Sequence, residues 1–229
     1  ESYLILITLF GLLCLREFGK MIQLKSVAPY IFFGVTIFLM FIRQKTFATS
    51  GILIITLASS LFFSYQLFTK KTINYNTERI KLGITIRYII FSFCFLVLLP
   101  FSDGLFHPYV MISILSIIWI NDSFAFLVGK NFGKKKLFPS VSPNKTVEGF
   151  IGGMFFSLLA SLVISKVYPH FSLFHWMMIA LLVSNLGTIG DLLVSKFKRQ
   201  ANLKDSGNLM PGHGGILDRL DSLLFASPF

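Results

Sequence analysis

Residues 109–128 read YVMISILSIIWINDSFAFLV, an apolar run of twenty residues whose one charged side chain is Asp122. A helix needs about 20 predominantly apolar residues to cross the hydrocarbon core of a bilayer. The run therefore predicts a membrane-spanning helix. An acidic side chain at this depth is costly unless it faces a polar cavity or a partner on another helix. Asp122 is thus a candidate for a polar site, and a structural carboxylate bonded to a neighbouring helix is the alternative.

Similar apolar runs recur along the 229-residue chain, which is 54% hydrophobic and only 14% charged. Ordinary soluble domains carry about 25% charged residues. We expect an all-α, polytopic integral membrane protein with about eight transmembrane helices, of which the first and last are cut short in this sequence. The expected spans are 2–15, 27–42, 48–68, 84–102, 109–128, 148–168, 175–194 and 215–229.

The net charge of +11 is distributed unevenly along the chain. Sixteen of the 21 lysine and arginine residues lie in the connections after the first, third, fifth and seventh expected spans. Short basic connections favour the cytoplasmic side of a membrane. The pattern predicts that these four connections face the cytoplasm, and it argues against nucleic acid as a partner. For the early loops, charge that only sets the topology is an equal alternative. The four basic connections are 16–26, 69–83, 129–146 and 195–214.

Several acidic residues are grouped in the stretch 204–222, KDSGNLMPGHGGILDRLDS, directly before the last apolar run. Asp218 and Asp221 lie three residues apart, and they share one face if a helix begins here. Acidic residues in a first turn also complement the helix dipole, but this does not explain His213 among glycines. A helix N-terminus after a glycine turn would in addition offer amide donors to a phosphate. The other polar or flexible positions of this stretch are Lys204, Asp205, Gly212, Gly214, Gly215 and Arg219.

Asp191 lies near the end of the preceding expected span, where Gly187 and Gly190 leave room for close helix packing. Carboxylates combined with basic side chains and a glycine-rich turn are typical of Mg²⁺-dependent phosphate chemistry, in which one or two carboxylates hold the ion. Glu1, Glu17, Glu78 and Asp103 are interpreted as lying at the end of the chain or in loops without a special role.

The basic loop at 129–147 is the second candidate region for phosphate binding. A basic loop beside a membrane helix sets topology or contacts anionic lipids in many proteins. Phosphate binding at this loop is an equal alternative, and Lys145 in SPNKT is favoured over the run Lys134–Lys136 because it directly precedes the next span. The polar residues of this loop are Lys130, Lys134, Lys135, Lys136, Ser142, Asn144, Lys145 and Thr146.

Two stretches resemble the phosphatidate cytidylyltransferase (CDP-diacylglycerol synthase) family. The first contains SKFKR at 195–199, KDSG at 204–207 and PGHGGILDRLD at 211–221, with no departure from the family signature. The second extends from Trp119 to Gly153. Residues 1–102 are interpreted as N-terminal transmembrane helices, and 103–229 as the catalytic region with cytoplasmic loops 129–147 and 195–214.

The resemblance implies an inner (cytoplasmic) membrane enzyme that joins CTP to phosphatidic acid on the cytoplasmic side, releasing pyrophosphate and forming CDP-diacylglycerol. Its partners would be these substrates, membrane lipids and, in a homodimer, a second copy of the chain. It also implies a two-cation Mg²⁺ centre whose acidic positions match Asp191, Asp218 and Asp221. The remaining catalytic residues would be His213, Lys204 and Arg219. The substrate-binding residues would be Ser195, Lys198, Arg199, Asp205, Gly212, Gly214, Gly215, Lys145, Ser142 and Asp122.

Two alternative functions predict different products. A CTP-dependent lipid kinase would transfer the terminal phosphoryl group and release CDP. An ion-coupled transporter is also typical of intramembrane acids, but transporters commonly contain two repeated halves with broken helices, and no internal repeat stands out here.

Overall fold

The computed structural model describes residues 2–42, 47–69, 72–102, 105–209, 212 and 214–229, most of which are helical. The helices are α1 (Ser2–Met21), α2 (Ala28–Ile42), α3 (Phe47–Thr69), α4 (Glu78–Thr85), the π-helical turn η1 (Ile86–Ile90), α5 (Phe91–Leu98), α6 (Pro108–Phe132), α7 (Val147–Val167), α8 (Leu173–Gln200) and α9 (Leu217–Ala226). Two antiparallel hairpins connect them. These are β1 (Phe101–Ser102) with β2 (Leu105–Phe106), and β3 (Lys136–Phe138) with β4 (Ser142–Thr146).

Five helical segments of the described chain are long and apolar enough to cross a membrane. They are Thr49–Thr69, Glu78–Leu98, Pro108–Phe132, Val147–Val167 and Leu173–Gln200. The expected helical membrane fold is therefore supported, but the expected count of about eight spans is not confirmed. The apolar helix Ala28–Met40 is shorter, α1 carries Arg16, Glu17 and Lys20 in its second half, and α9 has only 10 residues.

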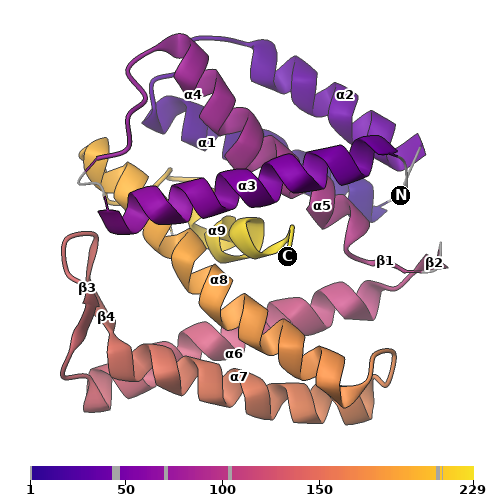
Figure 1. Ribbon diagram of the computed structural model, residues 1–229, viewed down its shortest axis with the longest axis vertical. Coiled ribbons are helices and arrows are strands. Elements are labelled where there is room, and N and C mark those ends of the chain that lie inside the picture. The colour runs from indigo at the N-terminus through magenta and orange to yellow at the C-terminus, as the bar shows by residue number, and fades with distance from the viewer. Residues whose placement is uncertain (1, 43–46, 70–71, 103–104, 210–211, 213) are drawn as a thin grey trace.

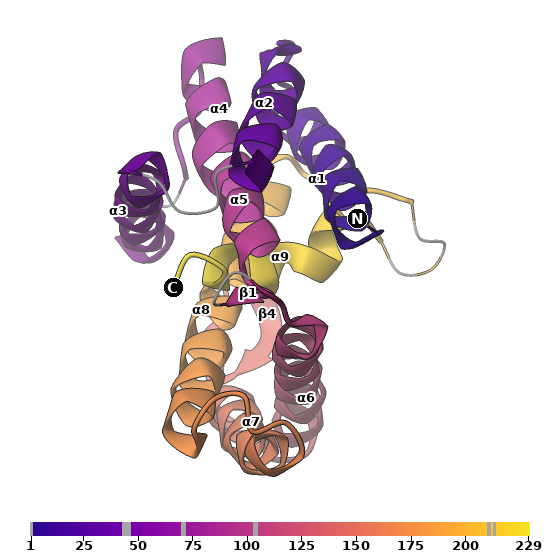
Figure 2. The same cartoon turned by 90° about the vertical axis from the view of Figure 1, so that its right-hand side faces the viewer.

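The helices form two layers with α9 between them (Figures 1 and 2). One layer contains α1 to α5, and the other contains α6, α7 and α8. The hairpin β3–β4, the C-terminal end of α8 and the connection from α1 to α2 lie at one end of the molecule, on the left in Figure 1. The hairpin β1–β2 and the turn between α7 and α8 lie at the opposite end. The basic connections therefore share one end of the structure.

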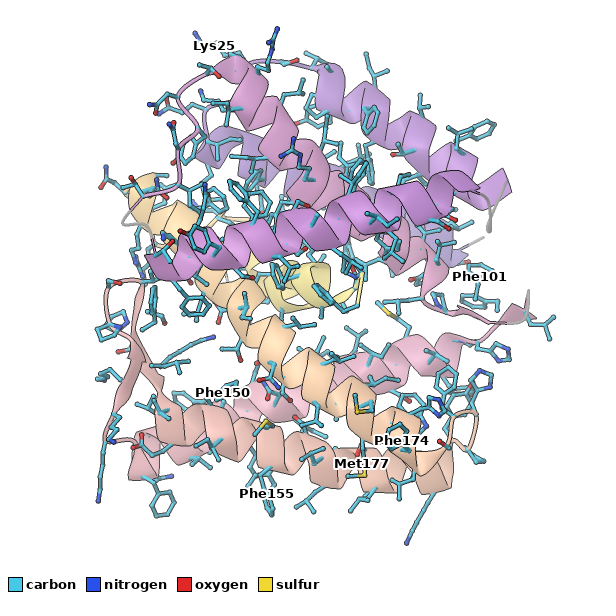
Figure 3. The ribbon with its side chains drawn as sticks, in the orientation of Figure 1. Lys25, Phe101, Phe150, Phe155, Phe174 and Met177 are labelled. Carbon is cyan, nitrogen blue, oxygen red and sulfur yellow. The ribbon has the colours of Figure 1, made fainter. Side chains whose placement is uncertain are left out.

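Large apolar side chains on the outer faces of the helices remain exposed. Phe155 on α7 is 55% exposed and Phe174 on α8 is 69% exposed (Figure 3). A soluble protein rarely leaves so many large apolar groups in water, so these faces fit contact with lipid. Cys14 and Cys94 are buried free thiols, and such residues typically act as small apolar packing groups.

The aromatic core joins the two layers close to the polar site. Phe18 of α1 packs edge-to-face on Phe197 of α8, with ring centroids 5.3 Å apart. Tyr88, in the π-helical turn η1, is buried, and its hydroxyl donates to the carbonyl oxygen of Gly190 at 3.5 Å. A π-helical turn inside an α-helix is rare and frequently lies at a functional site. Here it positions Tyr88 against the segment of α8 that carries Asp191.

Glycines set the spacing between the helices that carry the acidic residues. A Cβ atom on Gly190 would lie 2.5 Å from the carbonyl oxygen of Asp221, and one on Gly153 would lie 2.6 Å from that of Asn121. No real side chain fits at such distances without movement of the backbone. The close approach expected at Gly187 and Gly190 is thus confirmed, and it places Asp191 on α8 beside Asp221 on α9.

Candidate active site

A cavity of about 690 Å³ lies between α6, the β3–β4 hairpin, α7, α8 and α9. Both candidate regions of the sequence, far apart along the chain, contribute to its wall. The charged residues that line it are Asp122, Lys130, Lys136, Lys145, Asp191, Lys198, Asp218, Arg219 and Asp221. Among the described residues, then, four carboxylates and five basic side chains face one space. Such a cavity is suited to anionic substrates together with a cation.

Asp191 already has a basic partner from the hairpin. The ammonium group of Lys145 forms an ion pair with its Oδ2 atom, and the hydroxyl of Ser195 donates to Oδ1 at 3.2 Å. Thr146 follows Lys145 and caps α7, accepting the amide of Gly149 at 3.1 Å. The start of a membrane helix therefore anchors Lys145, which was expected to bind a substrate phosphate, at the mouth of the cavity.

Asp218 is held by donors on both of its oxygen atoms. Lys198 contacts Oδ1 at 2.6 Å, and Oδ2 accepts from the amide of Ser206 at 2.8 Å, its hydroxyl at 3.0 Å and the amide of Gly215 at 3.0 Å. Burial opposes ionisation of Asp218, but these donors outweigh it and lower the pKa of the carboxyl below its usual value. Asp218 therefore anchors Ser206 and Gly215 to the start of α9.

Asp221 lies in a different electrostatic environment. Its Oδ1 atom accepts the amide of Ser222 at 2.7 Å, and its side chain is buried. Burial and the negative charge of the neighbouring Asp191 raise the pKa of Asp221 above its usual value. Two carboxylates that repel one another while facing the same cavity favour a cation between them.

The donor set fits Mg²⁺ through two carboxylates better than through three. Among the described residues, no three acidic, histidine or cysteine side chains lie close enough together to hold a metal ion. All three carboxylates line the cavity, but Asp218 accepts from four donors. Asp191 has one ion pair and one hydroxyl donor, and Asp221 accepts one backbone amide. Mg²⁺ sites with one or two protein carboxylates commonly obtain their other ligands from water and substrate phosphates.

Glu17 lies beside the start of α9, contrary to the expectation from the sequence. It was interpreted as a loop residue without a special role, yet it is buried in α1, with only 7% of its surface exposed. Its carboxylate accepts from the amides of Ile216 at 3.1 Å and Leu217 at 2.8 Å, and from the hydroxyl of Ser206 at 3.0 Å. The available signal was its position, because an acidic residue within one turn of an apolar run is a candidate for burial.

The contacts of Glu17 also change the expectation for the N-terminus of α9. The amides there were expected to be available to a substrate phosphate. Instead Glu17 accepts two of them and Asp218 accepts that of Gly215. The protein's own carboxylates thus occupy the positive end of the helix dipole. A Cβ atom on Gly207 would lie 2.5 Å from Oε1 of Glu17, and one on Gly215 would collide with Oε2.

Several other expected site residues do not line this cavity. Arg199 donates to the carbonyl oxygens of Val141 at 3.4 Å and Leu203 at 3.3 Å, which ties α8 to the hairpin. Ser142 pairs with Phe138 in the hairpin. Lys204 and Asp205 are exposed on the turn. Gly212 and Gly214 have φ of +76° and +85°, values that favour glycine. His213 lies outside the described residues.

The fold and the cavity together define a multi-pass membrane protein with a charged site for anionic groups. Comparison with known proteins then gives its family. The model of the cytidylyltransferase family matches residues 2–229, and the chain belongs to this family.

Curated relatives share the match over nearly the whole chain. A protein of Bacillus subtilis (strain 168) named phosphatidate cytidylyltransferase is 37% identical, covering 99% of this chain and 86% of its own length. Proteins with the same name from Staphylococcus haemolyticus (strain JCSC1435) and Staphylococcus aureus (strain COL) are 34% and 35% identical. The alignments cover 96% and 98% of this chain, and 85% and 86% of those proteins.

Proposed function

We propose that this chain transfers the cytidylyl group of CTP to phosphatidic acid, giving CDP-diacylglycerol and pyrophosphate. The observation that carries the proposal is the shared cavity, where residues of both family-like stretches meet within a bundle of membrane helices. The names of the relatives support the same reaction. Because the basic connections share one end of the molecule, the positive-inside rule favours a cavity that opens to the cytoplasm.

The reaction requires little acid–base chemistry from the protein. A phosphate oxygen of phosphatidic acid, already anionic at neutral pH, forms a new bond to the α-phosphorus of CTP. The bond from that phosphorus to the bridging oxygen breaks, and pyrophosphate leaves with the electron pair. Catalysis then consists mainly of positioning and of electrostatic stabilisation, as in other phosphoryl transfers. His213 would orient a phosphate oxygen or assist in proton transfer.

The described residues have distinct roles in this proposal. Lys145 on the hairpin and Arg219 on α9 bind phosphate oxygens. Lys198 and Asp218 hold Ser206 and Gly215 at the start of α9. Mg²⁺ held by Asp191 and Asp221 would supply the positive charge that the phosphates require. Lys145 is paired with Asp191 in this structure, so its ammonium group is positioned to exchange this carboxylate for a phosphate oxygen. Asp122, on α6, contributes a further carboxylate to the wall of the cavity.

Position-specific labelling of CTP tests the reaction directly. Purified protein in mixed micelles with phosphatidic acid and Mg²⁺ is supplied with CTP radiolabelled either at the α-phosphate or at the γ-phosphate. Cytidylyl transfer labels the lipid only from the α-labelled nucleotide and releases labelled pyrophosphate from the γ-labelled one. Lipid labelled only from the γ-position would instead establish the lipid kinase. Uptake of a solute into proteoliposomes without lipid product would favour the transporter.

The wall of the cavity offers a matched pair of variants for the same assay. Lys145→Gln removes a basic group inside the cavity, and Lys134→Gln removes one from the same loop outside it. The backbone amide of Lys134 donates to the carboxylate of Glu148 at 3.0 Å, and glutamine at position 134 keeps this amide. The proposal requires that formation of labelled lipid falls in the Lys145 variant and not in the Lys134 variant. Equal labelling by the two variants would indicate that the loop only sets the topology.

A further inference from the structure

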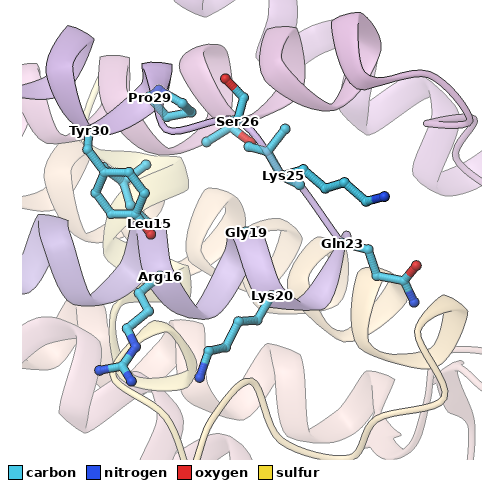
Figure 4. Close-up of a pocket in the computed structure, with 11 residues that line it drawn as sticks. Leu15, Arg16, Gly19, Lys20, Gln23, Lys25, Ser26, Pro29 and Tyr30 are labelled. Atoms are coloured by element: carbon cyan, nitrogen blue, oxygen red, sulfur yellow. The ribbon is translucent and has the colours of Figure 1, made fainter.

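A second, smaller cavity of about 280 Å³ lies between the end of α1 and the start of α2 (Figure 4). We call it the α1–α2 pocket. It shares no lining residue with the cavity that contains Asp191. Its basic lining residues are Arg16, Lys20 and Lys25, and Tyr30 of α2 lines the opposite side.

Two of these basic side chains have no partner within the described protein. Arg16 and Lys20 are one helical turn apart on α1 and exposed, and Figure 4 shows them extending in the same direction from the helix. Within the part of the chain that the structure describes, neither side chain forms an ion pair or a hydrogen bond. Lys20 lies in the last turn of α1, where it also complements the helix dipole. Arg16 lies farther from that end, so the dipole does not account for it.

An exposed apolar stripe leads along α1 to these two basic groups. Leu12 and Leu9 precede Arg16 by four and seven residues, so all three lie on one face of the helix. Leu12 is 38% exposed, Leu9 is 50% exposed and Ile5, farther along the same face, is 70% exposed. The stripe ends at the basic pair, on the same end of the molecule as the other basic connections (Figure 1). An apolar surface that terminates in two cations is complementary to an acyl chain that terminates in a phosphate.

The opposite wall of the pocket has a similar amphipathic character. Tyr30 of α2 is 37% exposed, and its hydroxyl points toward α1 in Figure 4. Tyrosine is enriched where membrane and water meet, because its ring is apolar and its hydroxyl forms hydrogen bonds. Neighbouring Ile31 is 68% exposed on the outer surface of α2. Both helices therefore combine apolar outer surfaces with polar groups at the pocket.

From this geometry we infer that the α1–α2 pocket binds the phosphate headgroup of an anionic phospholipid, with an acyl chain along Leu12, Leu9 and Ile5. Arg16 and Lys20 form charge-assisted hydrogen bonds to the phosphate oxygens. The bound lipid is not the substrate in the act of reacting, because this pocket lacks the carboxylates of the larger cavity. The inference does not depend on the proposed reaction, since it uses only charge, exposure and helix geometry.

Native mass spectrometry of the delipidated full chain tests the site. The protein in a neutral detergent is titrated with phosphatidylglycerol or with phosphatidylcholine, and the bound lipid is counted. Wild-type protein should retain phosphatidylglycerol preferentially. R16Q/K20Q should retain it about 30-fold more weakly. Each basic side chain near an anionic headgroup contributes about five-fold to the lipid affinity, and this variant loses two of them. R79Q/K134Q loses the same charge from exposed positions outside both cavities and should behave as wild type.

Three results would overturn the inference. One is equal retention of the two lipids by the wild type, and another is unchanged phosphatidylglycerol binding by R16Q/K20Q. The third is equally tight binding of soluble glycerophosphoglycerol, which would make the pocket a phosphate site with no role for the apolar stripe. The wild type alone gives a further test that does not depend on the folding of a variant. Added salt should lower phosphatidylglycerol retention because the contact is ionic, and retention that is insensitive to salt would contradict it.

Discussion

Replacing Glu17 with alanine should loosen the turn that carries the acidic residues of the active site. In the wild type, one buried carboxylate accepts from the amides of Ile216 and Leu217 and from the hydroxyl of Ser206. Ser206 also donates to Asp218 at 2.8 and 3.0 Å. Loss of the Glu17 side chain therefore leaves two backbone amides without their acceptor, leaves Asp218 as the acceptor of the Ser206 hydroxyl, and removes the link between α1 and the start of α9.

The expected magnitude follows from these contacts. A buried donor that loses its acceptor costs about 1–3 kcal/mol. Because the two amides share one carboxylate and can relax together, their costs are not additive, and we expect a loss of about 2–4 kcal/mol in the free energy of unfolding. Misplacement of a reacting group by about 1 Å can cost a hundred-fold in rate, so kcat should fall by about that factor. KM for CTP should change less, because Glu17 does not line the cavity.

The assay combines unfolding by SDS titration in mixed micelles with steady-state kinetics of CDP-diacylglycerol formation. Glu17→Gln keeps one carbonyl oxygen but replaces the other acceptor with an amide donor, so both losses should be intermediate. Glu78→Ala is the control, because Glu78 is half exposed at the start of α4, where it pairs with Lys81 at 3.0 Å. Wild-type stability together with wild-type kcat in Glu17→Ala would refute the reasoning. A lower stability with unchanged kcat in folded protein would reduce Glu17 to a structural role.

Three further predictions concern the active site and the topology. Asp191→Asn should nearly abolish turnover in folded protein, because asparagine keeps the shape of the side chain but loses the charge that attracts Mg²⁺; near wild-type turnover at saturating Mg²⁺ would remove Asp191 from the metal site. Lys145→Gln should raise the apparent KM for CTP or for phosphatidic acid about ten- to a hundred-fold, the value of one charge-assisted contact, while Lys134→Gln should leave both KM values near wild type in steady-state assays. Single cysteines introduced at 139–140 in a cysteine-free background should be labelled only from the cytoplasmic side, and those at 169–171 only from outside; the reverse pattern would overturn the proposed orientation.

The local patterns of the sequence predicted the helical membrane fold and named candidate site residues. Apolar runs report on lipid contact directly, because each residue in a long run must be compatible with the bilayer. The small side chains of Gly187 and Gly190 likewise predicted the close contact of α8 with α9, which the structure confirms. The family-like stretches, each defined by residue types at short spacing, predicted which parts of the chain would carry candidate site residues, and the structure shows that both stretches line one cavity.

Only the tertiary structure decided which partners and surroundings each acidic side chain has. Asp218 and Asp221 lie three residues apart and look equivalent in the sequence. Yet Asp218 is surrounded by donors from Lys198 and the turn, while Asp221 faces Asp191 in a buried position. Glu17 is about two hundred residues from the amides that it accepts, and no local pattern relates them. The donor that satisfies a given carboxylate depends on which helices pack together, and that arrangement is a property of the whole chain.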